Sequence, residues 1–428
     1  MADTSNTKGR LGILVGGGPA PGINGVIGAA AIEGLQHGVE VLGLYDGFKW
    51  LAEGDTSHVK PLTVDDVTLA RFRGGSILRT SRKNPTANKA EMRKVVATLR
   101  KLGIRYLVTI GGDDTAFSAC KTSEYAKGTI RVAHVPKTID NDLPLPGHMP
   151  TFGYQTARAL GGQLVGNLVE DARTTNRWYV VVAMGRSAGH LAMGMGVAGG
   201  AALTLIPEEF GKTVSLATLC HTIEAAMLKA SVQGREYGVV VLAEGIADLL
   251  IGELKNEAIA VVKNDEAGHL RLGEVPLALI VKRRLQQRAD ERGEQRTFVD
   301  ATVGYELRCA DPIAYDVDYT QQLGWGAIAY LLDPGQKRWP DTGRLIAIEA
   351  GELKPLRFAD ILDPKTGKTT VRRVDTSSVQ YRAARAYMTR LEREDLENPR
   401  QLRDLARAAR LAPAELRRKY ARLVGLRA

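Results

Sequence analysis

Short apolar stretches alternate with longer helix-like stretches between residues 11 and 243. Several of the apolar stretches contain no polar residue, as is typical of strands that are buried on both faces of a sheet. The predicted strands are Leu11–Val15, Val39–Leu44, Arg105–Ile110, Ile130–Val135, Trp178–Ala183, Ala202–Ile206 and Gly238–Ala243. The predicted helices cover residues 22–36, 88–102, 115–127, 154–172 and 213–231. This alternation predicts parallel sheets with crossover helices, whose ligands bind at the carboxyl ends of the strands.

A segment dense in proline and glycine, residues 141–153, divides this pattern into two halves. Each half contains a strand followed by a glycine-rich turn, at residues 11–25 and 179–199. The length of 428 residues also suits two domains. We therefore predict an α/β fold of two Rossmann-like domains with mostly parallel sheets. The charged stretch 284–297 is expected to be an exposed loop or a helix end.

Residues 381–428 are expected to form a helical C-terminal extension. Asn398-Pro399 and Ala412-Pro413 are typical helix starts, with proline at the first helical position. Two short amphipathic helices that dock on the body are indicated by apolar residues at Leu402, Leu405, Ala409, Leu416, Tyr420 and Leu423.

The positive charge of the chain is concentrated in this extension. Its 13 Lys and Arg residues and 6 Asp and Glu residues supply +7 of the net charge of +10. A basic tail can bind the phosphates of a nucleic acid, with a steep dependence on salt. A solvated face on docked helices explains the same charges more simply, so we expect no nucleic-acid partner.

The cysteines and the apolar stretches limit the class of protein. Cys120, Cys220 and Cys309 are far apart and form no CxxC pair, which excludes a zinc ribbon and a disulfide scaffold. This cysteine usage favours a reducing compartment. No apolar stretch approaches the ~20 residues of a membrane helix, and the first residues have no hydrophobic signal core. We therefore expect a cytoplasmic protein with no membrane partner.

A glycine-rich turn, Gly16–Asn24 (GGGPAPGIN), directly follows the first predicted strand and opens the first helix. Glycines let a ligand approach the backbone closely, and the free amides at a helix start favour an anion. The turn is not a dinucleotide fingerprint, because Pro21 stands in place of the third glycine, and it is not a Walker A loop. It is either a phosphate-binding loop or a tight connection.

Two adjacent acids, Asp113 and Asp114, follow another strand and two glycines. Neighbouring carboxylates repel each other unless a cation or a base compensates, and Asp113 is a suitable ligand for Mg²⁺. Thr115 is the residue expected to cap the next helix. A ligand can approach the acids across the two glycines, so a functional role is favoured over a structural one.

The segment Pro136–Asp142 (PKTIDND) places a lysine and two carboxylates at the end of a further strand. A carboxylate beside Mg²⁺ and a lysine can take the proton of a hydroxyl group as that hydroxyl attacks phosphorus. Lys137, Asp140 and Asp142 are therefore candidate catalytic residues. A solvated polar turn is the alternative, and the apolar strand before the segment disfavours it.

Arginines occur in two further turns. The turn Met184–Gly189 (MGRSAG) follows a strand that Arg177 begins, and arginine gives bidentate contacts to phosphate. The loop 74–82 (GGSILRTSR) either closes over phosphate oxygens or is a solvated basic loop. Glu244 after a strand and the segment 304–308 (GYELR) are weaker candidates.

Taken in order from about residue 10 to about residue 330, these motifs resemble those of the phosphofructokinases. The resemblance implies that the 1-hydroxyl of a sugar phosphate attacks a terminal phosphoryl group, with Mg²⁺ bound, in a homo-oligomer that is a dimer or a tetramer. The implied donor domain comprises residues 1–150 with roughly 307–350. The implied sugar-phosphate domain comprises residues 151–306 with roughly 351–380, and residues 381–428 form the extension.

The resemblance also implies a role for each motif. Asp140 matches the general base, Asp142 a second carboxylate of the catalytic turn and Asp113 the acid associated with Mg²⁺. Lys137 and Arg186 complete the implied catalytic group. The implied donor contacts are Gly17, Arg82, Asp114, Thr115 and Lys137. The implied sugar-phosphate pocket comprises Thr138, Asp140, Asp142, Arg177, Met184, Gly185, Arg186, Glu244, Tyr305 and Arg308, with Arg177 reaching into a neighbouring subunit's site.

Asp114 and Lys137 bear on the identity of the phosphoryl donor. ATP-dependent phosphofructokinases usually carry glycine at both positions, whereas pyrophosphate-dependent members carry this Asp and Lys. An aspartate beside the α-phosphate of a nucleotide adds bulk and like charge. Two unit charges ~4 Å apart interact by about 1 kcal/mol in water and about 4 kcal/mol at an effective dielectric constant near 20. Asn141 is a departure, because some pyrophosphate-dependent relatives carry glycine there.

The resemblance therefore implies reversible phosphoryl transfer from pyrophosphate to fructose 6-phosphate, which gives fructose 1,6-bisphosphate and phosphate. Three alternatives remain open from the residues alone. They are the same reaction with ATP as donor, a pyrophosphate-dependent reaction with sedoheptulose 7-phosphate as acceptor, and a catalytically silent regulatory subunit. The retained carboxylates Asp113, Asp140 and Asp142 disfavour the last alternative.

Overall fold

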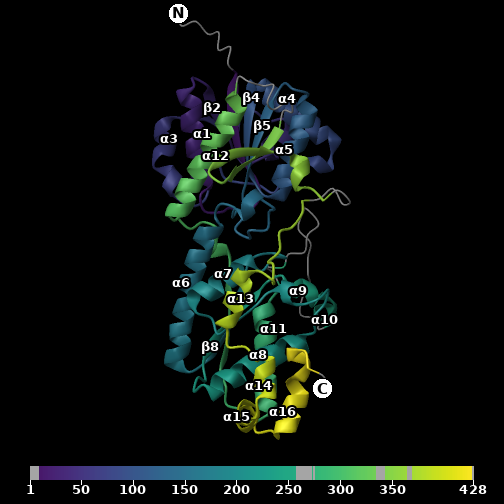
Figure 1. The fold of residues 1–428 in the computed structure, drawn as a ribbon. Helices are drawn as coiled ribbons and strands as arrows, with labels where there is room; N and C mark the ends of the chain where they lie inside the picture. The colour runs from purple at the N-terminus through teal and green to yellow at the C-terminus, as the bar shows by residue number, and fades with distance from the viewer. Residues whose placement is uncertain (1–8, 257–271, 273–274, 334–342, 364–368, 427–428) are drawn as a thin grey trace, which may run out of the picture. The chain divides into compact units, whose positions relative to one another are not determined.

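The computed structural model describes the chain except for residues 1–8, 257–271, 273–274, 334–342, 364–368 and 427–428 (Figure 1). The chain divides into two compact units. The first unit comprises Met1–Ala157 and Tyr305–Arg372, and the second comprises Arg158–Gly304 and Arg373–Ala428. The chain therefore passes between the units three times, and each unit has its own sheet and its own core.

The first unit is built on a seven-stranded sheet with the order β11-β10-β5-β4-β1-β2-β3. Its five central strands are parallel, and the two edge strands, β3 and β11, pair antiparallel with their neighbours. The strands are β1 (Arg10–Val15), β2 (Glu40–Leu44), β3 (Val59–Pro61), β4 (Ile104–Gly111), β5 (Arg131–Pro136), β10 (Gly343–Glu349) and β11 (Glu352–Leu356). The central strands are nearly all buried, because helices cover both faces of the sheet.

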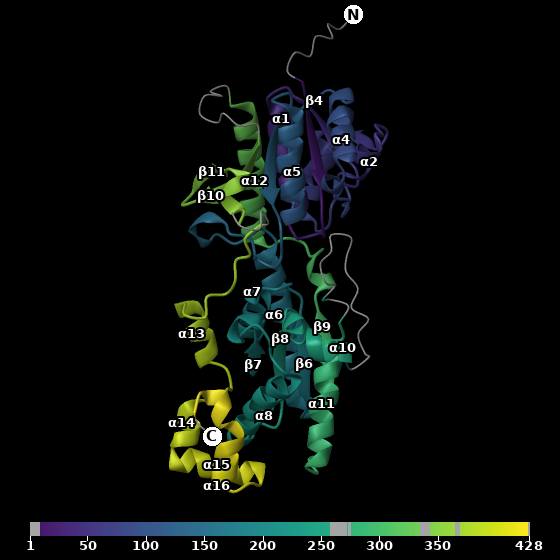
Figure 2. The ribbon, with the colours of Figure 1, turned by 90° about the vertical axis from the view of Figure 1, so that its right-hand side faces the viewer.

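Helices lie on both faces of this sheet (Figures 1 and 2). The helices α1 (Ile23–Gln36) and α12 (Ala314–Leu332) pack together on one face, and α4 (Lys89–Lys101) and α5 (Asp113–Ala126) cover the other. Alternate side chains of β1 therefore join different cores. Ile13 lies among residues of α1 and α12, whereas the next residue, Leu14, lies among residues of α4 and α5.

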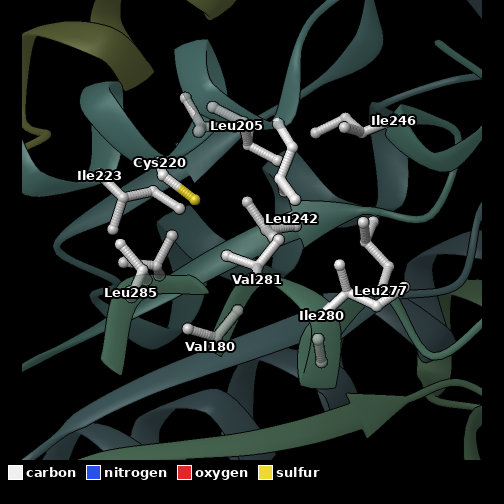
Figure 3. Close-up of a cluster of buried hydrophobic side chains, with 14 of the residues drawn as sticks. Val180, Leu205, Cys220, Ile223, Leu242, Ile246, Leu277, Ile280, Val281 and Leu285 are labelled. Carbon is white, nitrogen blue, oxygen red and sulfur yellow. The ribbon is translucent and has the colours of Figure 1, made fainter. Parts of the chain in front are cut away.

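The second unit contains a four-stranded parallel sheet with the order β7-β8-β6-β9. Its strands are β6 (Trp178–Ala183), β7 (Leu203–Leu205), β8 (Gly238–Ala243) and β9 (Phe298–Val303). The helices α8 (Leu216–Val232) and α11 (Leu277–Glu291) share an apolar core with one face of this sheet. Figure 3 shows Val180 and Leu242 of the strands meeting Ile223 of α8 and Val281 of α11.

Two further long helices pack against each other in this unit. They are α6 (Tyr154–Thr175), which begins in the first unit, and α7 (His190–Gly199), which contacts β7 and β8. Gly161 and Gly199 let them approach closely, since a Cβ atom at Gly161 would lie 2.5 Å from Met195 and one at Gly199 would lie 2.6 Å from Val165. The remaining α-helices are α2 (Lys49–Glu53), α3 (Val64–Thr68), α9 (Ile246–Leu249), α10 (Ile251–Asn256), α13 (Val379–Ala386), α14 (Arg393–Glu397), α15 (Pro399–Ala409) and α16 (Pro413–Tyr420).

The C-terminal extension docks on the body of the protein, as the sequence predicts, and the structure shows that it does so on α8 (Figure 2). Leu405 of α15 and Leu416 of α16 are buried against Ala225 and Leu228 of α8. The predicted helix starts are also confirmed. The Asn398 side chain caps α15 by accepting hydrogen bonds from the backbone amides of Arg400 at 2.9 Å and Gln401 at 3.3 Å.

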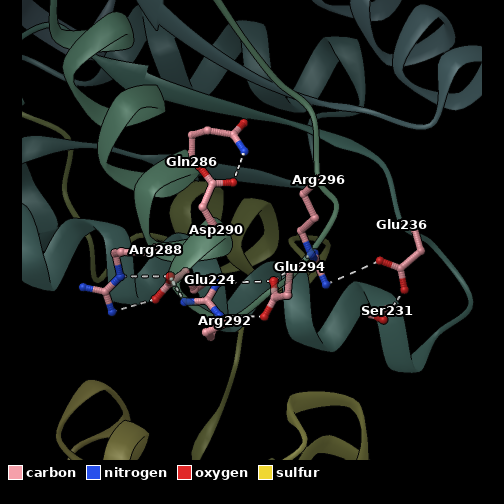
Figure 4. A network of polar contacts seen from close by, with 9 residues as sticks. All are labelled: Glu224, Ser231, Glu236, Gln286, Arg288, Asp290, Arg292, Glu294 and Arg296. Atoms are coloured by element: carbon pink, nitrogen blue, oxygen red, sulfur yellow. Dashed lines mark hydrogen bonds and ion pairs between the residues drawn. The ribbon is translucent and has the colours of Figure 1, made fainter.

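A network of ion pairs borders this docked extension (Figure 4). The buried carboxylate of Glu224 in α8 accepts hydrogen bonds from Arg288 Nε at 2.9 Å and from Arg292 Nη1 at 2.7 Å. Glu294 pairs with Arg292 at 2.6 Å and with Arg296 at 3.1 Å. A buried carboxylate is costly unless it is paired, so these arginines compensate the burial of Glu224. These charged side chains beside the extension are therefore engaged in structural ion pairs.

The seven predicted strands are all present, each within one residue of its predicted ends. The predicted helices are present as well, with ends that differ by at most three residues. The charged stretch 284–297 begins inside α11, which extends to Glu291, so it is a helix end followed by a loop. None of the helices in the described parts of the chain has both the length and the apolar character needed to cross a membrane.

Two predicted boundaries differ from those of the structure. The first unit continues to Ala157, seven residues beyond the predicted end of the donor domain at residue 150. Residues 351–372, which the resemblance assigns to the sugar-phosphate domain, also belong to the first unit. The reason for the second difference is a hairpin. Strand β11 pairs antiparallel with β10, from Leu345–Leu356 to Glu349–Glu352, and so extends the first sheet. The chain leaves the first unit for the last time only after Arg372.

Candidate active site

The glycine-rich turn after β1 lies beside the loop 74–82 in the first unit. The amide of Gly17 donates a hydrogen bond to the Ser81 carbonyl at 2.9 Å, and the Thr80 hydroxyl donates one to the Gly17 carbonyl at 2.6 Å. Gly17 has φ of +81°, a left-handed conformation that glycine adopts without strain. The structure thus brings Gly17 close to the segment that contains Arg82, as both were expected to face the donor.

The side chain of Thr115, in the first turn of α5, packs directly against two glycines. A Cβ atom at Gly16 would lie 2.4 Å from Thr115 Oγ1, and one at Gly111 would lie at the same distance. Only glycine therefore fits at either position while the buried threonine remains. The expectation that Thr115 caps α5 is wrong, because the N-cap residue is Gly112 and Thr115 lies inside the first turn.

Asp113 and Asp114 occupy the first turn of α5, at the carboxyl end of β4. Carboxylates are favoured there by the positive end of the helix dipole. Within the described residues, no group of three or more His, Cys, Asp or Glu side chains is arranged to hold a metal ion. Mg²⁺ commonly takes only one or two carboxylates together with phosphate oxygens and water, and Asp113 fits that donor set.

Lys137 connects the end of β5 to the glycine-rich turn. Its backbone amide donates to the Gly111 carbonyl at 2.8 Å, and its ammonium group donates to the carbonyl of Gly18. The residue is only 5% exposed. The ammonium lies against the turn, since a Cβ atom at Gly17 would be 3.8 Å from Lys137 Nζ. A buried cation is thereby placed at the backbone where an anion can bind.

His134 lies on β5 below this lysine, and motif reasoning did not find it. Its ring is fully buried, and Nδ1 is 2.9 Å from the Thr109 hydroxyl. Burial lowers the pKa of His134 to about 3, and the nearby charge of Lys137 acts in the same direction. The imidazole is therefore neutral near pH 7. The buried ammonium group of Lys137 consequently has no second positive charge beside it from His134.

The turn that follows Lys137 carries the candidate base. The Asp140 amide donates to the Thr138 hydroxyl at 3.0 Å, and the Thr151 hydroxyl donates to the Thr138 carbonyl at 2.8 Å. Asp140 and Asn141 are buried. Asn141 has φ of +57°, in the left-handed region where glycine and asparagine are the preferred residues. Glycine would also accommodate this φ, whereas most other residue types would not.

Arg308 and Tyr305 lie in the first unit, beside the glycine-rich turn. The Arg308 guanidinium lies 4.9 Å from the centre of the Tyr305 ring, and a Cβ atom at Gly18 would be 3.5 Å from Arg308 Cζ. The Tyr305 side chain is largely exposed. Arg308 therefore reaches the turn that also receives the ammonium of Lys137.

A second group of candidates gathers at the carboxyl ends of β6 and β8 in the second unit. Glu244 Oε1 accepts hydrogen bonds from the amides of Gly185 at 3.1 Å and Arg186 at 2.6 Å. The Met184 side chain packs on Gly304, where a Cβ atom would lie 3.0 Å from it. Arg186 has φ of +50°, so the buried Glu244 carboxylate holds a turn that the residue type alone disfavours.

Arg177 does not join this second group within the chain. It precedes β6, whereas Met184 and Arg186 follow it, and a six-residue strand separates the two ends by roughly 20 Å. The backbone of Arg177 is bound to Ala172 and Gly238 at the amino end of the sheet. The sequence candidates thus form one group in each unit, and Arg177 lies apart from the group of its own unit.

Comparison with known proteins identifies the family. The profile of the family described as Phosphofructokinase matches residues 10–331. The chain is 54% identical over 413 residues to the pyrophosphate–fructose 6-phosphate 1-phosphotransferase of Thermotoga maritima, covering 96% of this chain and 98% of that protein. It is 46% identical to the protein of the same name from Naegleria fowleri, covering 97% of this chain and 95% of that protein.

The chain belongs to the phosphofructokinase family.

The fold of this phosphofructokinase is also found among solved structures. A pyrophosphate-dependent phosphofructokinase from Marinobacter aquaeolei superposes with a TM-score of 0.64 over 89% of this chain and 90% of that one. The sequence identity is 17%, so this likeness concerns the fold. The prediction of a phosphofructokinase-like α/β fold with a helical C-terminal region is confirmed.

The motifs of this phosphofructokinase do not include Arg372, which contacts the Asp140 turn. Arg372 binds the backbone of that turn from more than 200 positions further along the chain. The sequence around it, TTVRRVD, matches none of the motifs considered above, and no pattern distinguishes Arg372 from its neighbour Arg373. Only the folded chain reveals the contact.

Proposed function

We propose that this phosphofructokinase transfers a phosphoryl group reversibly from pyrophosphate to the 1-hydroxyl of fructose 6-phosphate, giving fructose 1,6-bisphosphate and phosphate. Two relatives that match nearly the whole chain carry the name of this activity. The observation that carries the proposal in the structure is the hydrogen bond between Lys137 and Gly18, which places a buried cation at the glycine-rich turn.

The donor is pyrophosphate because of the charges that border the turn. Lys137 supplies a cation close to the phosphoryl group that moves, where a fixed charge stabilises the transition state without reorganising water. Asp114, in the first turn of α5, opposes the additional phosphate of a nucleotide by bulk and by like charge. Gly17, Arg82 and Thr115 complete the donor contacts.

Asp140 acts as the general base. It takes the proton of the 1-hydroxyl while the oxygen of that hydroxyl bonds to phosphorus, and the bridging P–O bond of pyrophosphate breaks to release phosphate. Thr138 positions Asp140 by accepting a hydrogen bond from its amide. Asp142, two residues further on, is the second carboxylate of the turn.

Asp113 is the residue that would hold Mg²⁺, together with phosphate oxygens of the donor. When bound, Mg²⁺ neutralises negative charge on the phosphate oxygens. The position of Asp113 at the end of β4, one residue before Asp114, supports this role.

In the second unit, Glu244 and the turn Met184–Arg186 bind the sugar phosphate, and Arg186 provides a cation for its phosphate. Arg177 contributes to the site of a neighbouring subunit in a homo-oligomer, a dimer or a tetramer. The first unit is accordingly the donor-binding unit, and the second unit binds the sugar phosphate. The proposed location of the reaction is the cytoplasm.

The proposal is tested by incubating the purified protein with fructose 6-phosphate, pyrophosphate and Mg²⁺. Formation of fructose 1,6-bisphosphate and phosphate in equal amounts is expected, and the reverse reaction should proceed from those products. Absence of turnover in both directions would overturn the proposal.

A further inference from the structure

One arginine fixes the backbone of the turn that carries Asp140. The Arg372 Nε atom donates to the Asn141 carbonyl at 3.1 Å, and Nη1 donates to the Met149 carbonyl at 2.9 Å. Nη2 donates to the side-chain oxygen of Asn141. The backbone amide of Arg372 also donates to the Asp142 carbonyl, at 2.6 Å.

The guanidinium is suited to this task by its geometry. It is planar and presents its N–H groups in a fixed fork, so three acceptors around it are held at fixed directions. Lysine has a charge of the same sign but no fork. Burial lowers the pKa of Arg372, and the negative charge of Asp142 opposes that shift. The cost of burying the guanidinium is offset by the acceptors of the turn.

Asn141 couples the arginine to the conformation of the turn. Its side-chain oxygen accepts from Arg372 and also from the Thr151 amide, at 3.1 Å. Its backbone is left-handed, with φ of +57°. Glycine would tolerate this φ, but it has no side-chain oxygen for Arg372 and Thr151. The asparagine therefore adds two anchors to a turn that glycine would leave freer.

Arg372 is the last residue of the first unit, and the chain is anchored again immediately after it. In the second unit, the amide of Val374 donates to Glu208 Oε1 at 3.0 Å, and Arg373 Nη1 donates to the Ser187 carbonyl at 3.3 Å. The same Glu208 oxygen accepts from the Gly189 amide at 2.9 Å. Within the first unit, Arg372 thus binds the turn of Asp140. Within the second unit, Arg373 binds the turn that follows Arg186 directly, and Val374 binds Glu208, which holds the same turn at Gly189.

We propose that Arg372 is a positioning residue for phosphoryl transfer: through Asn141 and the neighbouring carbonyls it holds the 140–142 turn in the geometry that the base requires. This inference rests on the proposed role of Asp140. Loss of Arg372 should lower kcat, because it lets Asp140 move from its position, and displacing a reacting group by about 1 Å can cost roughly a hundredfold in rate. Arg372 has little effect on KM, because it supplies no group to either substrate.

The test compares Arg372→Met with Arg357→Met, a change that removes an exposed arginine of the same unit, whose partner is Asp360. Arg372→Met should lower kcat by between about tenfold and a hundredfold and change the KM of either substrate by less than about threefold. Arg357→Met should match the unaltered protein. An Arg372→Met variant that matches Arg357→Met, or one that raises KM with kcat unchanged, would overturn the inference.

Two further variants keep the test decisive if Arg372→Met folds poorly. Arg372→Lys retains the charge and should be intermediate in kcat. Asn141→Gly retains the backbone conformation and should lower kcat by severalfold, since it removes the amide that Arg372 binds. Full activity of both variants would contradict the inference.

A double variant separates this inference from the proposed function. If Arg372 acts through Asp140, Asp140→Asn with Arg372→Met should be no slower than Asp140→Asn alone, because the group that Arg372 positions is already gone. A double variant whose kcat is lowered by the product of the two single-variant effects would contradict the positioning role. Failure of Asp140→Asn to reduce turnover would instead overturn the proposed base.

Discussion

The ammonium group of Lys137 donates a hydrogen bond to the backbone carbonyl of Gly18 and so joins the end of β5 to the turn after β1. Strands β5 and β1 are not neighbours, because β4 lies between them in the sheet. The lysine therefore spans the ends of three parallel strands, which is where ligands of such sheets bind. This contact fixes one of the two charges, with Asp114, on which the proposed donor specificity depends.

The base is tested by Asp140→Asn. The amide is nearly the same size as the carboxylate but cannot accept the hydroxyl proton, so turnover should fall by at least about a thousandfold. Binding of fructose 6-phosphate, measured by calorimetry, should change little. A loss of less than tenfold in turnover would remove Asp140 as the base.

Replacing both donor-selective side chains tests their role together. Asp114→Gly with Lys137→Gly removes the carboxylate from the first turn of α5 and the cation from the glycine-rich turn. Turnover with pyrophosphate should fall, and the ratio of the two kcat/KM values should move toward ATP. An unchanged ratio would show that these positions do not select the donor. Lys121→Gly with Glu124→Gly, an exposed pair later on α5, is the matched control.

The buried histidine gives a prediction about stability and pH. The pKa of His134 is about 3 in the folded protein, because burial disfavours its charged form, whereas an unfolded histidine titrates near 6.5. Between these values the unfolded state binds the additional proton, so the free energy of unfolding decreases as the pH falls from about 6.5 toward 3. Above about pH 7 the histidine adds no pH dependence.

His134→Gln keeps a polar side chain for the Thr109 hydroxyl but does not titrate. Urea unfolding of this variant should show a smaller decrease in stability between pH 6.5 and pH 4.5 than the unaltered protein shows. Equal slopes for His134→Gln and the unaltered protein would mean that His134 is not held neutral by burial.

Much of the fold follows from local patterns that can be read directly. Stretches such as Trp178–Ala183 and Gly238–Ala243 are continuously apolar, and each is a central strand of a parallel sheet. The helix starts at Pro399 and Pro413 follow from the fixed φ of proline. These features depend on a few adjacent residues, and for that reason the sequence predicts them well.

Other features depend on residues far apart in the chain. Residues 351–372 belong to the first unit because β11 pairs with β10, and β10 pairs with β5. Strand β5 lies more than 200 positions earlier in the chain, so local patterns do not reveal this pairing. Gly16 and Gly111 must be glycine because of Thr115, which the glycine motif alone does not reveal. Arg372 is identical in type to Arg373, and only its acceptors in the folded chain distinguish it.

The most direct test of the account is the donor preference of the unaltered protein. Initial rates of fructose 1,6-bisphosphate formation are measured with Mg²⁺ and with either pyrophosphate or ATP over the same range of concentrations. Repulsion of about 1–4 kcal/mol at Asp114 predicts that kcat/KM is between about tenfold and a thousandfold higher for pyrophosphate. Equal or faster turnover with ATP would contradict the assignment of Asp114 and Lys137 as the residues that select the donor.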